Sequence, residues 1–177
     1  MYLFRVDSRA YNVGDTISPA VQFENELEDE KAELEDLLNR LRPNNVPSRG
    51  DCLFLFSELA GALRFFAKYG GNIYKVRPNR CYFRGDMNLL DSALDLFRFT
   101  EDEDLRTAAV NKYWQNGSHT FSPCYEILVD SAIVDSIVLD NEQLNNVRAQ
   151  LREYGNCIEK CPTYINLLSR ELNSRCR

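Results

Sequence analysis

The sequence predicts an α+β domain, and three features of its 177 residues point to that class. Short apolar runs typical of strands occur towards both ends of the chain, and segments with helical spacing of apolar residues lie between and after them. Strands and helices do not alternate regularly, as they do in a doubly wound parallel sheet. A hydrophobic fraction of 44% is that of an ordinary globular protein, and the length suits one domain with a substantial core.

The expected strands are short and apolar. They span residues 2–6, 52–56, 72–76, 81–83, 125–129 and 132–139. Only Asp130 and Ser131 separate the last two of these strands, which is short enough for a tight turn or a bulge.

The expected helices follow local signals for a buried face and for a capped start. A helix over residues 27–42 has one apolar face, which is made by Leu34, Leu37, Leu38 and Leu41. Ser57 is placed to cap a helix that runs to the glycines at 70 and 71. Thr100 and Glu103 have the spacing of a capping box, which predicts a further helix to about Trp114.

The remaining segments are interpreted from turn and cap residues. The phrase RGDMNLLD, residues 84–91, is expected to form a loop that leads into a short helix. Two helices are expected in the tail, starting near Asn141 and Pro162. We therefore divide the chain into a core domain, residues 1–139, and a C-terminal helical extension, residues 140–177, that packs on the same domain.

Charge and hydropathy exclude several classes of protein. Lys and Arg number 21 against 27 Asp and Glu, a net charge of −6 that argues against non-specific binding to nucleic acid or to anionic membranes. The first residues, MYLFRVDSRAYNVGD, lack the uninterrupted apolar run of a signal peptide. No stretch approaches the ~18 consecutive apolar residues of a membrane span. The sequence therefore predicts a cytoplasmic protein without a membrane partner.

Cysteine and histidine offer little for a metal site. Cys157 and Cys161 have CxxxC spacing, but no second pair lies nearby and the only histidine, His119, is distant in sequence. A structural zinc site needs four nitrogen or sulfur ligands, so no metal is expected. Cys52, Cys81 and Cys124 lie in or beside apolar runs, where cysteine packs as a small hydrophobic residue.

Familiar catalytic strings are absent from the sequence. It contains no GxGxxG or GxxxxGK[ST] phosphate loop, and no GxSxG or HExxH. A histidine-activated nucleophile would have to use His119, for which a solvated loop position is the simpler interpretation.

Two charged residues interrupt apolar strands. Arg5 interrupts YLFRV, and Glu126 interrupts YEILV. A charge on the inner face of a strand is costly unless it is paired or functional. The alternative for both residues is that strand alternation places them on a solvated face.

Three separated elements resemble the signature of the ADP-ribosyltransferase superfamily. YLFRVDSR resembles its first element, a polar residue in an early strand, here Arg5. CLFLFSELAGALRFFAKYGGNIYKV resembles the second, a strand that runs through Ser57 into a helix. PCYEILVDSAIV resembles the third, a late strand with a glutamate, here Glu126. The phrases FRVDSR, RGDMNLLD and PCYEILV are similar to a poorly characterised bacterial branch, over roughly residues 2–139.

The resemblance implies a split β-sandwich with flanking helices, and an enzyme that uses NAD as co-substrate. Glu126 would accept a hydrogen bond from the ribose 2′-hydroxyl and stabilise the oxocarbenium-like state. Arg5 would bind the ribose or the pyrophosphate through its planar fork of donors. Ser57 would orient Glu126 or the nicotinamide ribose, although helix capping explains it equally well.

Further polar and aromatic residues are candidates to bind the cofactor. Asp7, Ser8 and Arg9 follow the first strand directly. The phrase RGDMNLLD contributes three more, Arg84, Asp86 and Asn88, for which a turn or a helix cap is the alternative. Tyr113 and Trp114 could stack on a ring of NAD, but tryptophan more often lies in a core.

The sequence departs from the family pattern at two places. Phe56-Ser57-Glu58 offers one hydroxyl where the family has a Ser-Thr-Ser triplet. Cys124 stands where relatives that modify arginine carry a second acid, so arginine is not the expected target.

Three functions are left open by the sequence. The first is an ADP-ribosyltransferase, toxin-like or acting in defence, with a protein, a nucleic acid or a small molecule as acceptor and an inhibitory protein as a possible partner. The second is a non-catalytic module that binds NAD, ADP-ribose or a protein. The third is an interaction protein that uses the acidic helix 27–42, although such a charge run is more often a solvated face.

Overall fold

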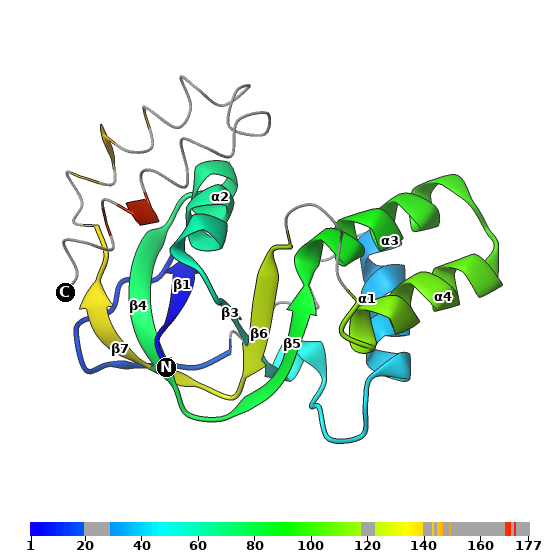
Figure 1. Ribbon diagram of the computed structural model, residues 1–177, viewed down its shortest axis with the longest axis horizontal. Coiled ribbons are helices and arrows are strands. Elements are labelled where there is room, and N and C mark those ends of the chain that lie inside the picture. The colour runs from blue at the N-terminus through cyan, green and yellow to red at the C-terminus, as the bar shows by residue number, and fades with distance from the viewer. Residues whose placement is uncertain are drawn as a thin grey trace. The chain divides into compact units, whose positions relative to one another are not determined.

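The fold is taken from a computed structural model, drawn in Figure 1. It describes residues 1–19, 29–117 and 123–139, together with Gln143, Asn145, Asn146, Ala149, Ser169, Arg170 and Leu172. Within these residues lie seven strands and four α-helices, and every strand pairing with a recorded register is antiparallel. This confirms the predicted α+β class.

The chain divides into two compact units. Unit 1 is drawn from Met1–Ile17, Leu55–Asn79 and Ala132–Arg177, and unit 2 from Ser18–Phe54 and Arg80–Ser131. Each unit therefore combines segments that are far apart in the sequence.

Unit 1 is built on an antiparallel sheet. Its strands lie in the order β2 (Thr16–Ile17), β7 (Ala132–Ile137), β4 (Asn72–Pro78), β1 (Leu3–Asp7) and the end of β3 (Leu53–Phe56). The register of β1 on β4 places Arg5 opposite Tyr74 and Asp7 opposite Asn72. Those two pairs bring polar groups of both strands to the end of β1.

Helix α2 (Leu59–Tyr69) packs against β1 and β4 of this sheet. Leu59, Leu63 and Phe66 are buried, as their spacing predicted, and Gly70 caps the end of the helix with a positive φ. The predicted N-cap is wrong, because Glu58 takes that position and Ser57 precedes it. The helix therefore starts later than the serine signal suggested.

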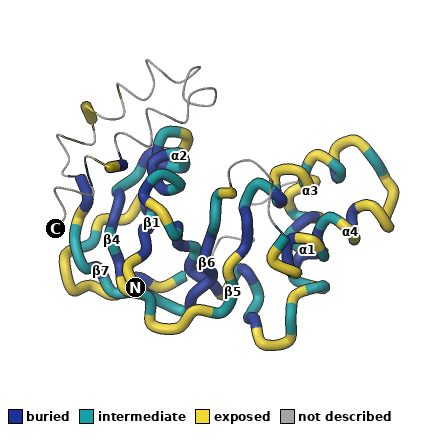
Figure 2. Tube along the Cα trace, viewed as in Figure 1, coloured by how far each residue is buried: buried dark blue, intermediate teal, exposed yellow. Residues whose placement is uncertain are grey.

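Unit 2 combines three helices with an antiparallel pair of strands. The helices are α1 (Glu30–Leu41), α3 (Met87–Phe99) and α4 (Glu103–Trp114), and the 3-10 turn η2 (Arg49–Asp51) follows α1. Strand β5 (Cys81–Asp86) pairs with β6 (Tyr125–Val129). The three helices contact one another, and buried residues of all three belong to one hydrophobic core. Figure 2 marks the buried residues in dark blue. The predicted leucine face of α1 is confirmed, since Leu34, Leu37 and Leu38 are buried in this core.

Three local predictions in unit 2 were wrong. Residues 84–91 form no loop, because β5 continues to Asp86 and α3 begins at once with Met87. Helix α4 uses no capping box from Thr100: the side chain of Asp102 accepts hydrogen bonds from the N–H groups of Asp104 and Leu105 instead. Cys81, expected to pack as a hydrophobic residue, is exposed, whereas Cys52 is buried.

Asp130 and Ser131 connect β6 to β7, and these two strands pair with other strands of the described part of the chain. Strand β6 pairs with β5, while β7 pairs with β4 and β2. The short connection therefore carries the chain from a strand of unit 2 to a strand of unit 1.

Several predictions lie outside the described residues. These are the two tail helices beyond residue 139, apart from isolated positions, and the residues His119, Cys157 and Cys161. Within the described ranges, none of the helices combines the length and the apolar character needed to cross a bilayer.

Substituting Gly71 tests the close approach between the start of β4 and the end of β1. Its φ is +101°, and a Cβ there would lie 2.8 Å from the carbonyl oxygen of Asp7. Gly14 has a similar φ of +94° but open space around it. We expect Gly14→Ala to cost about 1 kcal/mol from backbone strain alone, and Gly71→Ala to cost at least about 1 kcal/mol more because of the added clash. Urea unfolding measures both, and equal losses would contradict the close approach.

Candidate functional site

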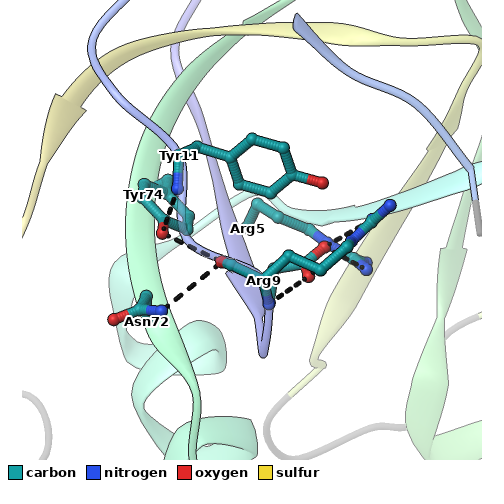
Figure 3. Close-up of polar contacts among 6 residues, drawn as sticks. Arg5, Arg9, Tyr11, Asn72 and Tyr74 are labelled. Carbon is teal, nitrogen blue, oxygen red and sulfur yellow. Dashed lines mark hydrogen bonds and ion pairs between the residues drawn. The ribbon is translucent and has the colours of Figure 1, made fainter. Parts of the chain in front are cut away.

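A carboxylate, that of Asp7, is held between two guanidinium groups at the end of strand β1 in unit 1. Figure 3 shows the two arginines, Arg5 and Arg9. Arg5 and Asp7 share one face of the strand because side chains alternate with period two. Nε and Nη2 of Arg5 donate to Oδ2 of Asp7 at 3.1 and 3.0 Å. Nε of Arg9 donates to Oδ1 of Asp7 at 2.9 Å, and its Nη2 donates to Oδ2 at 2.8 Å. We call these three residues the Arg5–Asp7–Arg9 cluster.

The backbone after β1 is fixed by polar groups of β4. The hydroxyl of Tyr74 donates to the carbonyl oxygen of Arg9 at 3.1 Å and accepts from the N–H of Tyr11 at 3.0 Å. The side-chain amide of Asn72 donates to the same carbonyl at 3.4 Å (Figure 3). These bonds from β4 fix the backbone at Arg9, which follows β1.

Two tyrosine rings accompany the cluster. The rings of Tyr11 and Tyr74 make an edge contact with centroids 5.6 Å apart. The guanidinium carbon of Arg9 lies 5.4 Å from the centroid of the Tyr11 ring, within cation–π range. The cluster therefore combines charge with aromatic surface.

The three charged groups of the cluster differ in exposure. The side chain of Asp7 is 3% exposed, that of Arg5 19% and that of Arg9 42%. Burial alone would raise the pKa of Asp7, but hydrogen bonds from Arg9 and the charge of Arg5 outweigh it and lower that pKa. Burial lowers the pKa of Arg5 against the opposing charge of Asp7. Two cations thus surround one firmly ionised carboxylate, and the more exposed cation is Arg9.

Glu126 lies in unit 2, in a buried network of its own. Its Oε1 accepts a hydrogen bond from the hydroxyl of Tyr113 at 2.6 Å and another from Nη1 of Arg49 at 3.0 Å. Nε of Arg49 also donates to both oxygens of Glu35, at 3.2 and 2.9 Å. We call these four residues the Glu126 network.

In this network one cation, Arg49, is paired with two carboxylates, those of Glu35 and Glu126. Although burial alone would lower the pKa of Arg49, the charge of Glu126 and then that of Glu35 raise it well above its ordinary value. Burial, followed by the charge of Glu126, raises the pKa of Tyr113, so its hydroxyl stays protonated and donates. The solvated-face alternative for Glu126 is therefore wrong, since its side chain is only 4% exposed.

The other predicted site residues occupy varied positions. Asp86 is buried and caps α3, because its Oδ1 accepts from the N–H groups of Asn88 and Cys124 at 3.1 and 2.9 Å. Arg84 is exposed, and its guanidinium lies 3.5 Å from the centroid of the Tyr125 ring. Asp86 thus caps a helix, which was the alternative predicted for it.

The remaining candidates are a tryptophan and two serines. Trp114 lies in the core of unit 2, where its Nε1 donates to the carbonyl oxygen of Leu38 at 3.0 Å. This is the core position that the sequence analysis weighed against stacking on NAD. Ser8 is exposed after β1, and Ser57 is half-buried before α2 in unit 1.

An open groove of about 720 Å³ lies in unit 2, beside α1, α3 and α4. Arg106 is buried next to it, where it donates to the carbonyl oxygen of Phe97 at 3.0 Å and is paired with the exposed Glu33 and Glu101. None of the site residues predicted from the sequence lines this groove, which is bordered by Glu33, Asp36, Leu37, Asn39, Arg40, Arg42, Phe97, Glu101, Glu103 and Arg106.

Sequence reasoning missed the partners of both charged centres that lie far away in the sequence. A buried glutamate in a strand signals that a donor must exist, but nothing local selects Arg49, which is 77 residues away. Tyr74 is likewise far from Arg9 in sequence and is recognisable only through the register of β4 on β1.

Comparison with known proteins adds no family. No protein-family model matches the chain, and no curated protein matches it significantly. Among the described residues, no group of three or more His, Cys, Asp or Glu side chains is arranged to hold a metal ion.

The depressed pKa of Asp7 makes a prediction for the pH dependence of stability. Because the folded-state pKa lies below the unfolded value, its contribution is present above about pH 4 and is lost as the pH falls through the folded-state pKa. We expect Asp7→Asn to be less stable than the wild type at neutral pH, with the difference shrinking in acid. Urea unfolding across this range measures it, with the exposed Asp95→Asn as the matched control. A difference that does not change with pH would contradict the assignment.

Proposed function

We propose that this protein is an NAD-dependent ADP-ribosyltransferase. The observation that supports it most is the Arg5–Asp7–Arg9 cluster, because a carboxylate orients two guanidinium groups at the end of the strand that carries the first family-like element. The proposal rests on the sequence resemblance together with this geometry.

The cluster suits the recognition of a pyrophosphate. Guanidinium groups bind phosphate oxygens through pairs of N–H donors, and a fixed guanidinium loses less entropy on binding than a mobile one. The charges of Arg5, Asp7 and Arg9 sum to one positive charge, which favours an anionic ligand. Tyr11 adds an aromatic ring beside Arg9, on which a base or the nicotinamide ring can stack.

Glu126 takes the role of the acid in this proposal. In the reaction, the bond between the ribose C1′ and the nicotinamide nitrogen breaks, and nicotinamide leaves with the bonding electrons as a neutral molecule. A nucleophile of the acceptor forms the new bond to C1′ and releases its proton. The carboxylate of Glu126 stabilises the positive charge that develops on the ribose and accepts a hydrogen bond from its 2′-hydroxyl.

A non-catalytic module that binds NAD or ADP-ribose is the second candidate. The observation that favours it is the Glu126 network itself, since the ion pair with Arg49 and the bond from Tyr113 explain a buried glutamate without any substrate. The two candidates differ in one outcome, the release of nicotinamide.

The experiment combines calorimetry with a nicotinamide-release assay on the full chain, with cell extract as the source of acceptors. We expect the wild type to bind NAD and release nicotinamide. Glu126→Gln should bind NAD but lose at least about a hundredfold in release, because it lacks the charge that stabilises the transition state.

The matched control is Glu101→Gln, the same change at a side chain that is 94% exposed. It should release nicotinamide at the wild-type rate. NAD binding without release by the wild type would favour the binding module, and absence of both would remove the proposal.

A further inference from the structure

The two carboxylate oxygens of Glu126 differ in the hydrogen bonds that they accept. Both of its hydrogen bonds, from Tyr113 and from Arg49, end on Oε1. Among the described residues, Oε2 accepts no hydrogen bond. A carboxylate held by one oxygen keeps the other available as an acceptor while losing its freedom to rotate.

Arg49 is itself fixed on several sides. Its Nε donates to both oxygens of Glu35 on α1, and its Nη1 donates to the hydroxyl of Tyr113 at 2.8 Å as well as to Glu126 on β6. Its guanidinium lies 4.9 Å from the centroid of the Phe54 ring and 5.5 Å from that of Tyr113. A buried guanidinium that is bound on several sides cannot move when the carboxylate of Glu126 rotates. Arg49 therefore holds Oε1 in one position.

Tyr113 reaches Glu126 because of a glycine. In the register of β5 on β6, Gly85 lies directly opposite Glu126. A Cβ on Gly85 would lie 2.3 Å from Cε2 and 2.7 Å from Cζ of Tyr113, so the ring occupies the space that a side chain would fill. The rings of Phe83 and Trp114 pack against the same tyrosine, with centroids 5.2 and 4.9 Å away.

We propose that Tyr113 and Arg49 are positioning residues that hold Oε1 of Glu126 and thereby present Oε2 to the ribose of NAD. This inference rests on the proposed function. A carboxylate that is oriented before the substrate arrives needs no rearrangement when the positive charge develops, so its orientation affects the transition state more than the bound substrate. Loss of a positioning residue should therefore lower kcat and leave KM for NAD unchanged.

Tyr113→Phe tests the proposal with the smallest change, since it removes only the hydroxyl. We expect kcat for nicotinamide release to fall about tenfold to a hundredfold, the range for losing a hydrogen bond to a charged group. KM and the stoichiometry of NAD binding by calorimetry should stay at wild-type values. A variant that was partly unfolded would instead lose binding sites in proportion to its lost activity.

Three further variants and a control test the same role. Gly85→Ala displaces the ring of Tyr113 and should reproduce the kinetic effect of Tyr113→Phe. Arg49→Lys keeps the positive charge and should retain more kcat than Arg49→Met. Tyr82→Phe makes the same chemical change at a half-buried tyrosine of unit 2 outside the network, and should release nicotinamide at the wild-type rate.

The outcomes separate this inference from the proposed function. If the wild type releases nicotinamide and Tyr113→Phe keeps kcat within about twofold of it, the positioning role is wrong and the proposed function stands. A loss of NAD binding in Tyr113→Phe that matches the loss of rate would also overturn the role, in favour of a purely structural one. If the wild type releases no nicotinamide, the proposed function fails, and the positioning role fails with it.

Discussion

A carboxylate that is removed from water must find hydrogen-bond donors inside the protein, and each unit contains such a carboxylate. In unit 1 the carboxylate is Asp7, which is bound by Arg5 from its own strand and by Arg9 from the segment after it. In unit 2 it is Glu126, which is bound by Arg49 from 77 residues away and by Tyr113 from 13 residues away. Removing one partner of such a group leaves a buried charge uncompensated, so each centre tolerates little change.

The two centres differ in what they can offer a ligand. The Arg5–Asp7–Arg9 cluster carries a positive balance, and its outermost member, Arg9, is 42% exposed. The Glu126 network carries a negative balance and is almost fully enclosed, with Tyr113 and Arg49 on the same oxygen of the glutamate. A cationic centre suits the anionic pyrophosphate of a dinucleotide, and an oriented carboxylate suits a ribose that becomes positively charged.

The sequence predicted the parts of the fold that depend on local signals. The apolar runs at 52–56 and 125–129 form strands, and the leucine face of α1 is buried. Such patterns can be recognised in a short stretch of sequence, because the spacing of apolar residues follows the period of a strand or a helix. Predictions of helix starts failed where several polar residues competed, as at Thr100, where Asp102 two residues later provides the cap. The part of β5 over residues 84–86 was missed, since a loop was expected there before the helix, whereas in the fold Gly85 lies in the strand and makes room for Tyr113.

The candidate site was predictable only in part, for the same reason. Arg5, Asp7 and Arg9 lie within five residues of one another, so their grouping at a strand end follows from the sequence. Glu126 could be chosen as a charge inside an apolar strand, but its partner Arg49 is 77 residues away and lies in a turn without periodic pattern. Tertiary pairing of this kind depends on which segments the whole chain brings together, and local residue patterns do not encode it.

The most direct test of the central claim is to follow both halves of NAD in one reaction. Cell extract is incubated with NAD and the full-length protein; released nicotinamide is quantified, and mass spectrometry counts ADP-ribose added to protein, nucleic acid or small molecules. The account predicts that nicotinamide and ADP-ribose adduct appear in equal amounts, and that neither forms with Glu126→Gln. Equal yields from wild type and Glu126→Gln, or no nicotinamide release from the wild type in the extract, would contradict it.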